Sequence, residues 1–232
     1  MFNISDNNWG FLNDERMKEL ESIYEKVKGN IFPTEDKVLR FLEADYNNLK
    51  YVIVGMEPYP TATKIDGMMV PEATGRSFEV ASVNSWCDKF RQSSLRNILK
   101  SVIYAKTGEI VSMEKARSLV TKGDVPMMPP HQWFDSLEKQ GVLFLNASLT
   151  VEPNNVGSHE KLWDKFMTEL ICHIDKVEGV KWLLWGQVAQ NRVLPHIDSS
   201  KASLARHPRL NEFIDDNCFK ENNAVNWLGT ES

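Results

Sequence analysis

The chain has 232 residues, of which 42% are hydrophobic and 25% are charged, and its formal net charge is -5. This length and composition predict one globular domain over residues 1–232, with residues 1–30 as a helical N-terminal extension. No apolar run approaches the roughly 18 residues that a membrane helix needs, so we expect no transmembrane segment. The N-terminus has neither the basic nor the apolar region of a secretory signal peptide.

The cysteines and the charge exclude several classes of protein. Cys87, Cys172 and Cys218 are scattered, odd in number and without CxxC spacing, so neither a disulfide framework nor a zinc or iron–sulfur site is indicated. We therefore expect no metal, no cofactor and a reducing, cytoplasmic location. The negative net charge does not favour a nucleic-acid-binding protein, but a local basic groove would be enough for one.

The first third of the chain predicts two helices and a strand. Residues 14–28 carry apolar side chains at helical spacing, and Asn13 precedes them as a possible cap. Residues 35–43, with Thr34 before them and acids in the first turn, predict a second helix. The β-branched and aromatic run 51–54 predicts a buried strand.

The rest of the chain alternates between helices and strands. Residues 61–76 have few periodic apolar side chains and are expected to form a long loop. The spacing of apolar residues predicts helices over 93–105, 114–121, 133–140, 159–176, 187–193 and 211–222, and strands over 142–145, 182–185 and 203–206. Continuous apolar strands separated by helices predict an α/β fold, a three-layer α/β/α arrangement with a central four-stranded parallel sheet.

Polar side chains follow three of the expected strands. Glu57, Asn146 and His207 come directly after the runs 51–54, 142–145 and 203–206. The carboxyl ends of parallel strands meet at one edge of a sheet, so we expect these side chains to converge there. Together with Tyr59 and Phe78, an acid, an amide and an imidazole would suit a planar ligand that forms hydrogen bonds.

Each of these residues also has an ordinary structural interpretation. Glu57 could be a surface acid in a proline-rich loop, and Asn146 could be a turn former. His207 could be a structural histidine with satisfied hydrogen bonds, and Phe78 could be a core residue. The residue types alone leave these alternatives open.

Five motifs, in the same order, make the chain similar to the family 1 uracil-DNA glycosylases. They are Gly55-Met56-Glu57-Pro58-Tyr59-Pro60, Gly141-Val142-Leu143-Phe144-Leu145-Asn146, Ser158-His159, Leu183-Leu184-Trp185-Gly186 and His207-Pro208-Arg209-Leu210. The resemblance spans about residues 31–228. It implies the uracil-DNA glycosylase fold and hydrolysis of the N-glycosidic bond of a flipped-out uracil in DNA, which leaves an abasic site.

The resemblance also implies roles for the residues around the base. Glu57 would orient the attacking water and stabilise the cationic sugar. His207 would donate a hydrogen bond to the departing base, and the backbone of Met56 would assist. The remaining roles fall to base-binding residues: Asn146 would read the base edge, Phe78 would stack on the ring, and Tyr59 would exclude thymine.

A second group of residues is implied to bind DNA outside the base. Ser94, Ser158 and His159 would hold phosphates. Leu210 would fill the hole left in the base stack, and Arg209 would bind a phosphate. No lysine matches a Schiff-base position, so we expect a monofunctional enzyme. The resemblance further implies binding of single- or double-stranded DNA as a monomer, without a membrane partner.

The chain departs from the family pattern near the expected site. Glu57 stands where the family has aspartate. The additional methylene of glutamate would move the carboxylate by about 1 Å, and a displacement of that size can slow a reaction by about 10²-fold. The loop 61–76 is longer than in typical members, and the loop that carries Leu210 is one residue shorter. Three functions therefore stay open: a uracil glycosylase, a glycosylase for a different or modified pyrimidine, and a non-catalytic DNA-binding member of the fold.

Overall fold

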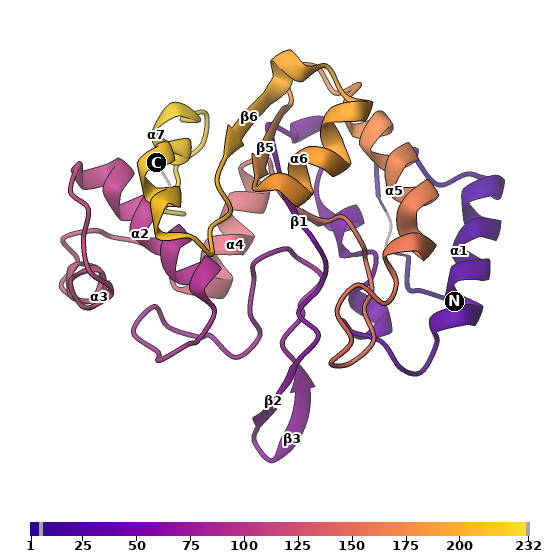
Figure 1. The fold of residues 1–232 in the computed structure, drawn as a ribbon, viewed down its shortest axis with the longest axis horizontal. Helices are drawn as coiled ribbons and strands as arrows, with labels where there is room; N and C mark the ends of the chain where they lie inside the picture. Colours follow the sequence, from indigo (N-terminus) through magenta and orange to yellow (C-terminus); the bar gives the residue numbers. More distant parts are fainter. Residues whose placement is uncertain (5–6, 231–232) are drawn as a thin grey trace.

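The computed structural model describes residues 1–4 and 7–230 (Figure 1). Its central sheet has four strands: β1 (Tyr51–Gly55), β4 (Val142–Asn146), β5 (Lys181–Trp185) and β6 (Ala202–Ala205). They lie in the order β4-β1-β5-β6, and every neighbouring pair is parallel. The expected four-stranded parallel sheet is confirmed, with strand bounds within about a residue or two of those predicted.

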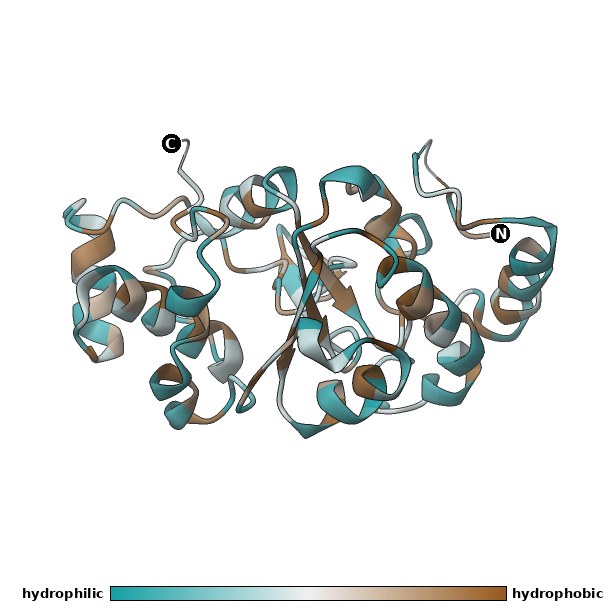
Figure 2. Ribbon diagram, turned by 90° about the horizontal axis from the view of Figure 1, so that it is seen from above, coloured by the Kyte–Doolittle hydropathy of each residue, from teal (hydrophilic) through white to brown (hydrophobic). Residues whose placement is uncertain are grey.

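The sheet is buried on both faces. In β1, Tyr51 and Ile53 belong to one buried apolar cluster, and Val52 and Val54 belong to a second. The first cluster takes side chains from α2 (Ser93–Thr107), α3 (Met113–Thr121), α4 (Pro130–Lys139) and α7 (Cys218–Glu221). The second takes them from α1 (Asp14–Val27), α5 (Glu160–Ile174) and α6 (Gln187–Val193). The predicted three-layer fold is thus present, and Figure 2 shows apolar strands between helices with polar outer faces.

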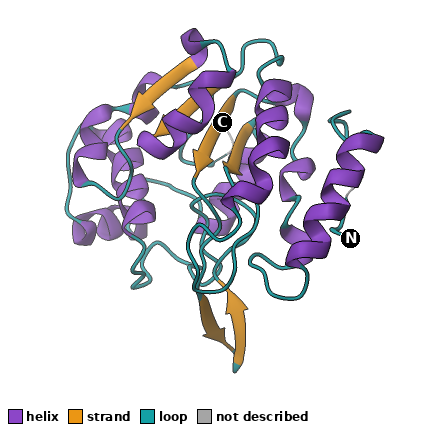
Figure 3. Cartoon of the chain, turned by 45° about the vertical axis from the view of Figure 1, so that its right-hand side comes forward, coloured by secondary structure: helices purple, strands orange, loops and turns teal. Residues whose placement is uncertain are grey.

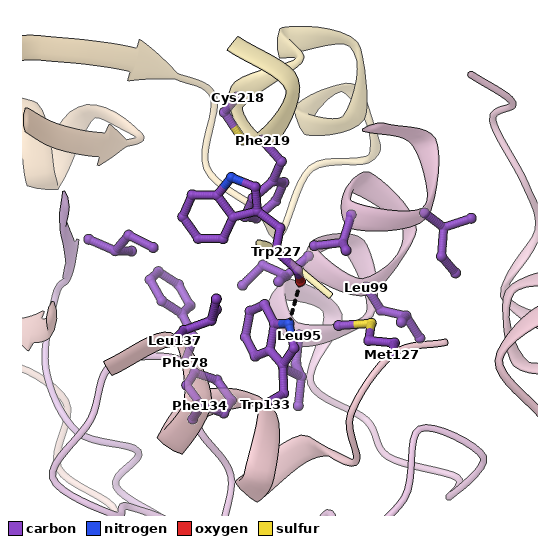
Figure 4. Close-up of a cluster of buried hydrophobic side chains, with 14 of the residues drawn as sticks. Phe78, Leu95, Leu99, Met127, Trp133, Phe134, Leu137, Cys218, Phe219 and Trp227 are labelled. Carbon is purple, nitrogen blue, oxygen red and sulfur yellow. Dashed lines mark hydrogen bonds between the residues drawn. The ribbon is translucent and has the colours of Figure 1, made fainter. Parts of the chain in front are cut away.

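Aromatic side chains join the C-terminal segment to the first cluster. Figure 4 shows Trp133 of α4 donating its indole N–H to the carbonyl of Trp227, over an N–O distance of 2.6 Å. Phe219 of α7 packs edge-on against Trp227, with 4.9 Å between ring centroids. The last residues of the described chain therefore cover one face of the sheet.

The N-terminal segment packs onto the second cluster. Phe2, Trp9 and Leu20 are buried there, and the Trp9 indole donates to the Ala44 carbonyl over 2.8 Å. The Asn13 side chain accepts from the backbone of the first helical turn, so α1 begins where the sequence predicts. Within the described residues, no helix combines the length and apolarity needed to cross a membrane.

Two of the expected helices are not continuous α-helices. Residues 35–43 form two short 3-10 turns, Glu35–Lys37 and Arg40–Glu43. Thr34 provides no side-chain cap, and the apolar side chains of the segment pack into the second cluster from this tighter backbone. Residues 211–222 divide into a 3-10 turn (Asn211–Asp216) and α7, separated by Asn217 in the left-handed conformation.

The prediction of a long loop over 61–76 is wrong. An antiparallel hairpin, β2 (Ala62–Ile65) and β3 (Met68–Pro71), occupies most of this segment. Asp66 and Gly67 form its turn with φ angles of 50° and 86°. Asp-Gly is the pair that a two-residue hairpin turn of this geometry favours. Figure 3 shows the hairpin projecting from the loops at the carboxyl edge of the sheet.

Candidate active site

Glu57 and Asn146 follow neighbouring strands and lie at the same edge of the sheet. Gly55, the last residue of β1, pairs with Asn146, the last residue of β4. Beyond the strands, the Ala147 N–H donates to the Gly55 carbonyl over 2.8 Å. The loop that carries Glu57 is therefore held against the segment after β4, as the parallel sheet predicts.

The Asn146 side chain is buried and has no hydrogen-bond partner among the described residues. Its exposed fraction is 2%. A Cβ on Gly55 would lie 2.7 Å from Asn146 Oδ1 and 2.8 Å from Ser77 Cβ, so glycine is required for this close approach. Neither amide atom is among the fully enclosed side-chain atoms that lack a partner, so both keep some contact with solvent and are available to a ligand.

Phe78 lies beside both His207 and the sheet. The Ser77 N–H donates to the Phe144 carbonyl over 3.3 Å, which fixes the loop on β4. Phe78 itself has a φ of 64°, a strained conformation for a bulky residue that is frequent at functional sites. Its ring centroid lies 5.5 Å from that of Trp185 and 6.3 Å from that of His207. Only 8% of Phe78 is exposed, and Figure 4 shows it among core side chains.

Buried charges hold the loop on both sides of Phe78. Arg76 and Glu79 are 6% and 2% exposed. Arg76 donates to Asp135 over 2.7 Å and to Glu138. Glu79 is bonded by Thr74 over 2.6 Å and by His131 over 3.0 Å. Burial raises the pKa of Glu79, but the hydrogen bond from His131 and the charge of Arg76 outweigh it and leave that pKa below its usual value. The sequence analysis gave none of these residues a role.

The hydrogen bonds of His207 determine its tautomer. Its Nδ1 accepts from the Arg209 N–H over 3.0 Å, so the proton of a neutral ring sits on Nε2. Burial, with a smaller effect from the Arg209 charge, lowers the pKa of His207 below its ordinary value. A Cβ on Gly186 would lie 2.7 Å from His207 Cβ, so glycine at the end of β5 gives the imidazole its place. The result is a neutral ring with one N–H left to donate.

Asn97 fixes the loop that carries His207, and the sequence analysis missed it. Its Nδ2 donates to the carbonyls of Pro208 and Leu210, over 2.7 Å and 3.1 Å. Asn97 is 3% exposed, on the inner face of α2. The signal that would have found it is a single polar residue on the buried face of an apolar helix.

The Glu57 carboxylate faces a separate part of the edge. It is half-buried, and its Oε2 accepts from the Gly157 N–H over 2.9 Å. Burial raises the pKa of Glu57, the hydrogen bond from Gly157 lowers it, and the nearby charge of Glu160 raises it further, so the pKa lies above the usual value. A backbone donor thus fixes one carboxylate oxygen and leaves the other for water or ligand.

Glu57 and His207 lie at the same edge of the sheet but line two different cavities. Glu57 and Met56 line one of about 320 Å³, and His207 lines another of about 410 Å³ with Arg209 and Leu210. Phe78 and Asn146 line neither of these cavities. The expected slot for a flat ring is therefore nearly closed at its centre, because the stacking ring and the amide are both buried.

The remaining base-binding and DNA-binding residues lie around this edge. Tyr59 packs against the first cluster, and burial, together with Glu72, raises its pKa, so the phenol stays neutral. The exposed fractions of Met56 and Leu210 are 43% and 44%, so Leu210 points outward rather than into the core. Arg209 is exposed as well, and Ser94 lies in the first turn of α2.

Ser158 and His159 are more enclosed than phosphate-binding residues usually are. The Ser158 hydroxyl accepts from the Glu152 N–H over 2.8 Å. His159 is 5% exposed, and its Nδ1 is 3.0 Å from the hydroxyl of Thr150. Thr150 also accepts from the Trp163 indole over 2.7 Å, and the His159 Nε2 lies 3.9 Å from a Glu152 carboxylate oxygen. Among the described residues, no cluster of His, Cys, Asp and Glu could hold a metal ion.

The comparisons with known proteins place this geometry in a family. No family model matches the chain. Its fold is similar to the wild-type UNG of Nitratifractor salsuginis (TM-score 0.68, 21% identity, 93% of this chain and 87% of that one). It is also similar to mimivirus uracil-DNA glycosylase (TM-score 0.60, 24% identity, 87% and 71%).

Two curated sequence relatives share more of their sequence with the chain than these two structures do. A uracil-DNA glycosylase of Francisella tularensis subsp. holarctica is 30% identical over 224 residues, covering 88% of this chain and 87% of its own. A uracil-DNA glycosylase of Buchnera aphidicola is 33% identical over 190 residues, covering 80% and 71%. With that identity over most of both sequences, the chain belongs to the uracil-DNA glycosylase family.

Proposed function

We propose that the protein carries out the family's reaction with Glu57 and His207 as its catalytic groups. As a uracil-DNA glycosylase it is a monofunctional hydrolase that cleaves the N-glycosidic bond of a flipped-out uracil in DNA and leaves an abasic site. The observation that carries the assignment of roles is the hydrogen bond from the Arg209 N–H to His207 Nδ1, which leaves a neutral Nε2–H donor at the sheet edge.

His207 would stabilise the leaving base. When the glycosidic bond breaks, the uracil departs with negative charge shared between the ring nitrogen that carried the sugar and its carbonyl oxygens. A preorganised N–H aimed at that charge lowers the barrier most when it costs no reorganisation. Asn97 and the Gly186 position hold the imidazole in one orientation, which supports this role.

Glu57 would act on the sugar side of the bond. The sugar passes through an oxocarbenium-like state, which a carboxylate stabilises while it orients the attacking water. Gly157 holds one oxygen of Glu57, so the other is the one that we assign to the water. The hydrogen bond from Gly157 favours the carboxylate form of Glu57 that this role requires, and so acts against the burial that raises its pKa.

The base would be read by buried side chains. The amide of Asn146 has an unused donor and an unused acceptor, which match the edge of uracil. Phe78 would stack on the ring, Tyr59 would stand against ring carbon 5, and the Met56 backbone would contact the base. The burial of Phe78 and Asn146 fits a site that opens as the nucleotide enters.

The DNA outside the base would be held by five residues. The exposed Leu210 is suited to fill the gap in the base stack, and Arg209 beside it to bind a phosphate. Ser94, Ser158 and His159 would bind phosphates of the distorted strand.

We further propose that residues 1–232 work as one domain and as a monomer in the cytoplasm, without a cofactor. The burial of Phe2, Trp9 and Leu20 in the second cluster supports a single unit, because the N-terminal segment shares the core of the sheet. Size-exclusion chromatography with light scattering tests the monomer, with and without DNA.

The test of function is the release of free base from defined oligonucleotides. A duplex with a single uracil should yield alkali-labile abasic sites and free uracil. The hairpin inserted between Tyr59 and Phe78 favours one alternative substrate, a modified pyrimidine, and release from modified DNA alone would establish it. Tight binding without base release would instead identify a non-catalytic DNA-binding protein.

Replacing Asn97 by alanine should separate positioning from stability. Asn222→Ala is the matched control, because Asn222 is also a buried amide and donates hydrogen bonds to Cys218 and Ser203. Each variant should lose about 1–3 kcal/mol of stability. Only Asn97→Ala should also lower kcat, by roughly tenfold or more, because Asn97 holds the loop that carries His207. Urea unfolding and base-release kinetics measure the two effects, and equal kcat in both variants would contradict the role.

The pH dependence of base release should reflect His207 and Arg209. The reaction needs neutral His207, whose pKa lies below the ordinary 6.5, so the catalytic form persists at pH values below that. Removing the positive charge in Arg209→Gln should raise the His207 pKa and move the acid limb of kcat to higher pH. Only the midpoint of the limb is compared, because Arg209 also has a proposed phosphate contact. An unchanged midpoint would contradict the assignment.

A further inference from the structure

The β2–β3 hairpin is built into the active-site edge. It begins just after Tyr59, and β3 leads back within a few residues to Phe78. At its base the Glu72 N–H donates to the Thr61 carbonyl over 2.9 Å, and the Ala81 N–H donates to the Glu72 carbonyl over 3.0 Å. Figures 1 and 3 show the hairpin projecting away from both helical layers.

Two adjacent methionines lie exposed beside the hairpin turn. The exposed fractions of Met68 and Met69 are 69% and 67%, the largest among the large apolar side chains of the described residues. Met69 pairs with Lys64 across the hairpin, and Met68 pairs with Ile65. A two-stranded hairpin alone is marginally stable in water, and exposed apolar side chains of this size are typical of binding surfaces.

A groove with unpaired cations lies at the base of the hairpin. Its volume is about 520 Å³, and Thr63, Lys89 and Arg91 are among the residues that line it. Within the described part of the chain, neither these two cations nor Lys64 forms an ion pair. The groove continues to Gln92, the residue before α2 and its Ser94.

The carboxylates of the groove are already engaged by the protein. Glu72 is buried and accepts from the Ser82 hydroxyl over 2.8 Å. Asp88 accepts from the backbone N–H groups of Asn84 and Ser85, over 3.0 Å and 2.8 Å. The cations are thus the groups left to bind a partner, and the only other acid on the hairpin is Asp66 in the turn.

We propose that the hairpin and its groove contact the DNA that flanks the target nucleotide. Lys64, Lys89 and Arg91 bind phosphates, and Met68 and Met69 pack against sugars and bases in the groove of the duplex. The inference rests on the proposed function, because DNA is the ligand that the adjoining edge would hold. The continuity of the hairpin with Tyr59 and Phe78 places its base at the active-site edge, and its tip projects outward from there, where DNA that flanks the target nucleotide would lie.

Two double variants test the proposal, each with a matched control. Met68→Ser/Met69→Ser removes the apolar tip, and Ile110→Ser, which is 62% exposed beyond α2, is its control. Lys89→Ala/Arg91→Ala removes the groove cations, and Lys106→Ala/Lys122→Ala is its control, at the distant ends of α2 and α3. All replaced side chains are exposed, so thermal unfolding should be unchanged.

The substrates are a 30-base-pair duplex and a 5-nucleotide single strand, each with one uracil. We expect both hairpin variants to raise KM for the duplex by about tenfold, with kcat unchanged and no effect on the short strand. The cation variant should also reduce the slope of log KM against log salt by about two, and the methionine variant should not. The controls should match the unmodified protein.

Three other outcomes overturn the hairpin proposal. Hairpin variants that act on the duplex like the unmodified protein show that the arm does not touch DNA. A lower kcat on the short strand shows that the hairpin shapes the base site instead. A change only in self-association assigns the tip to a second copy. If the unmodified protein releases no base, the proposed function fails, and fluorescence anisotropy of a labelled duplex still tests the hairpin.

Discussion

Replacing His207 by alanine should slow uracil release by about 10²–10³-fold, the usual effect of removing one preorganised donor from a developing negative charge. Replacing Glu57 by alanine should slow it by about 10²–10⁴-fold, because both the water and the cationic sugar lose the carboxylate. Single-turnover release from a uracil duplex measures both. Because the two groups act on one transition state, the double variant should lose less than the product of the single effects.

Two further variants distinguish chemistry from folding. His207→Gln keeps a neutral N–H donor and should recover part of the lost rate. His196→Ala removes a half-buried histidine that has no assigned role and should leave the rate unchanged. A His207→Ala protein that folds normally and releases uracil at the original rate would remove His207 from the mechanism.

Replacing Arg76 by methionine should produce the largest loss of stability, about 3–5 kcal/mol. The change leaves Glu138 without its guanidinium partner and leaves Glu79, which is 2% exposed, with Arg40 as its remaining arginine, at 3.4 Å. Native domains have a total stability of about 5–15 kcal/mol, so the loss is a large fraction of the whole. Urea unfolding measures it, and base-release kinetics should show weaker substrate binding because the Phe78 loop is no longer held.

The control for this prediction is Lys165→Met. Lys165 bridges Glu15 over 3.2 Å on the surface, where both side chains are more than half exposed, and lies 3.9 Å from Glu19 and Glu169, so its loss should change stability far less than the loss of Arg76. In the double variant Arg76→Met/Glu79→Gln, part of the stability should return, because one uncompensated charge is gone. Equal stability of Arg76→Met and Lys165→Met would show that the buried charges do not hold the loop.

The sheet and its edge could be predicted because their signal is local. Residues 51–54, 142–145 and 182–185 are continuous apolar runs, and such runs between helices have few other folds available. The positions of Glu57, Asn146 and His207 follow from parallel pairing alone. Their assigned roles came from the motifs, and base-release experiments are what will test them.

The support around the site could not be predicted, because its contacts join distant parts of the chain. Arg76 and Asp135 are 59 residues apart, and Asn97 and Pro208 are 111 residues apart. Nothing in the local pattern names such partners. The same limit explains the segment 35–43, where packing into the second cluster, rather than helical spacing, determines the backbone. The hairpin is different, since Asp66-Gly67 is a local signal for its turn.

Helix α2 connects two ends of the proposed reaction. Ser94 and Asn97 stand three residues apart on it, so they share one face of a rigid rod. Ser94 would grip the DNA backbone, while Asn97 holds the carbonyls on both sides of Arg209. A movement of α2 on DNA binding would therefore also move the loop that carries His207. The proposed phosphate contact and the position of the His207 donor would then depend on the same helix.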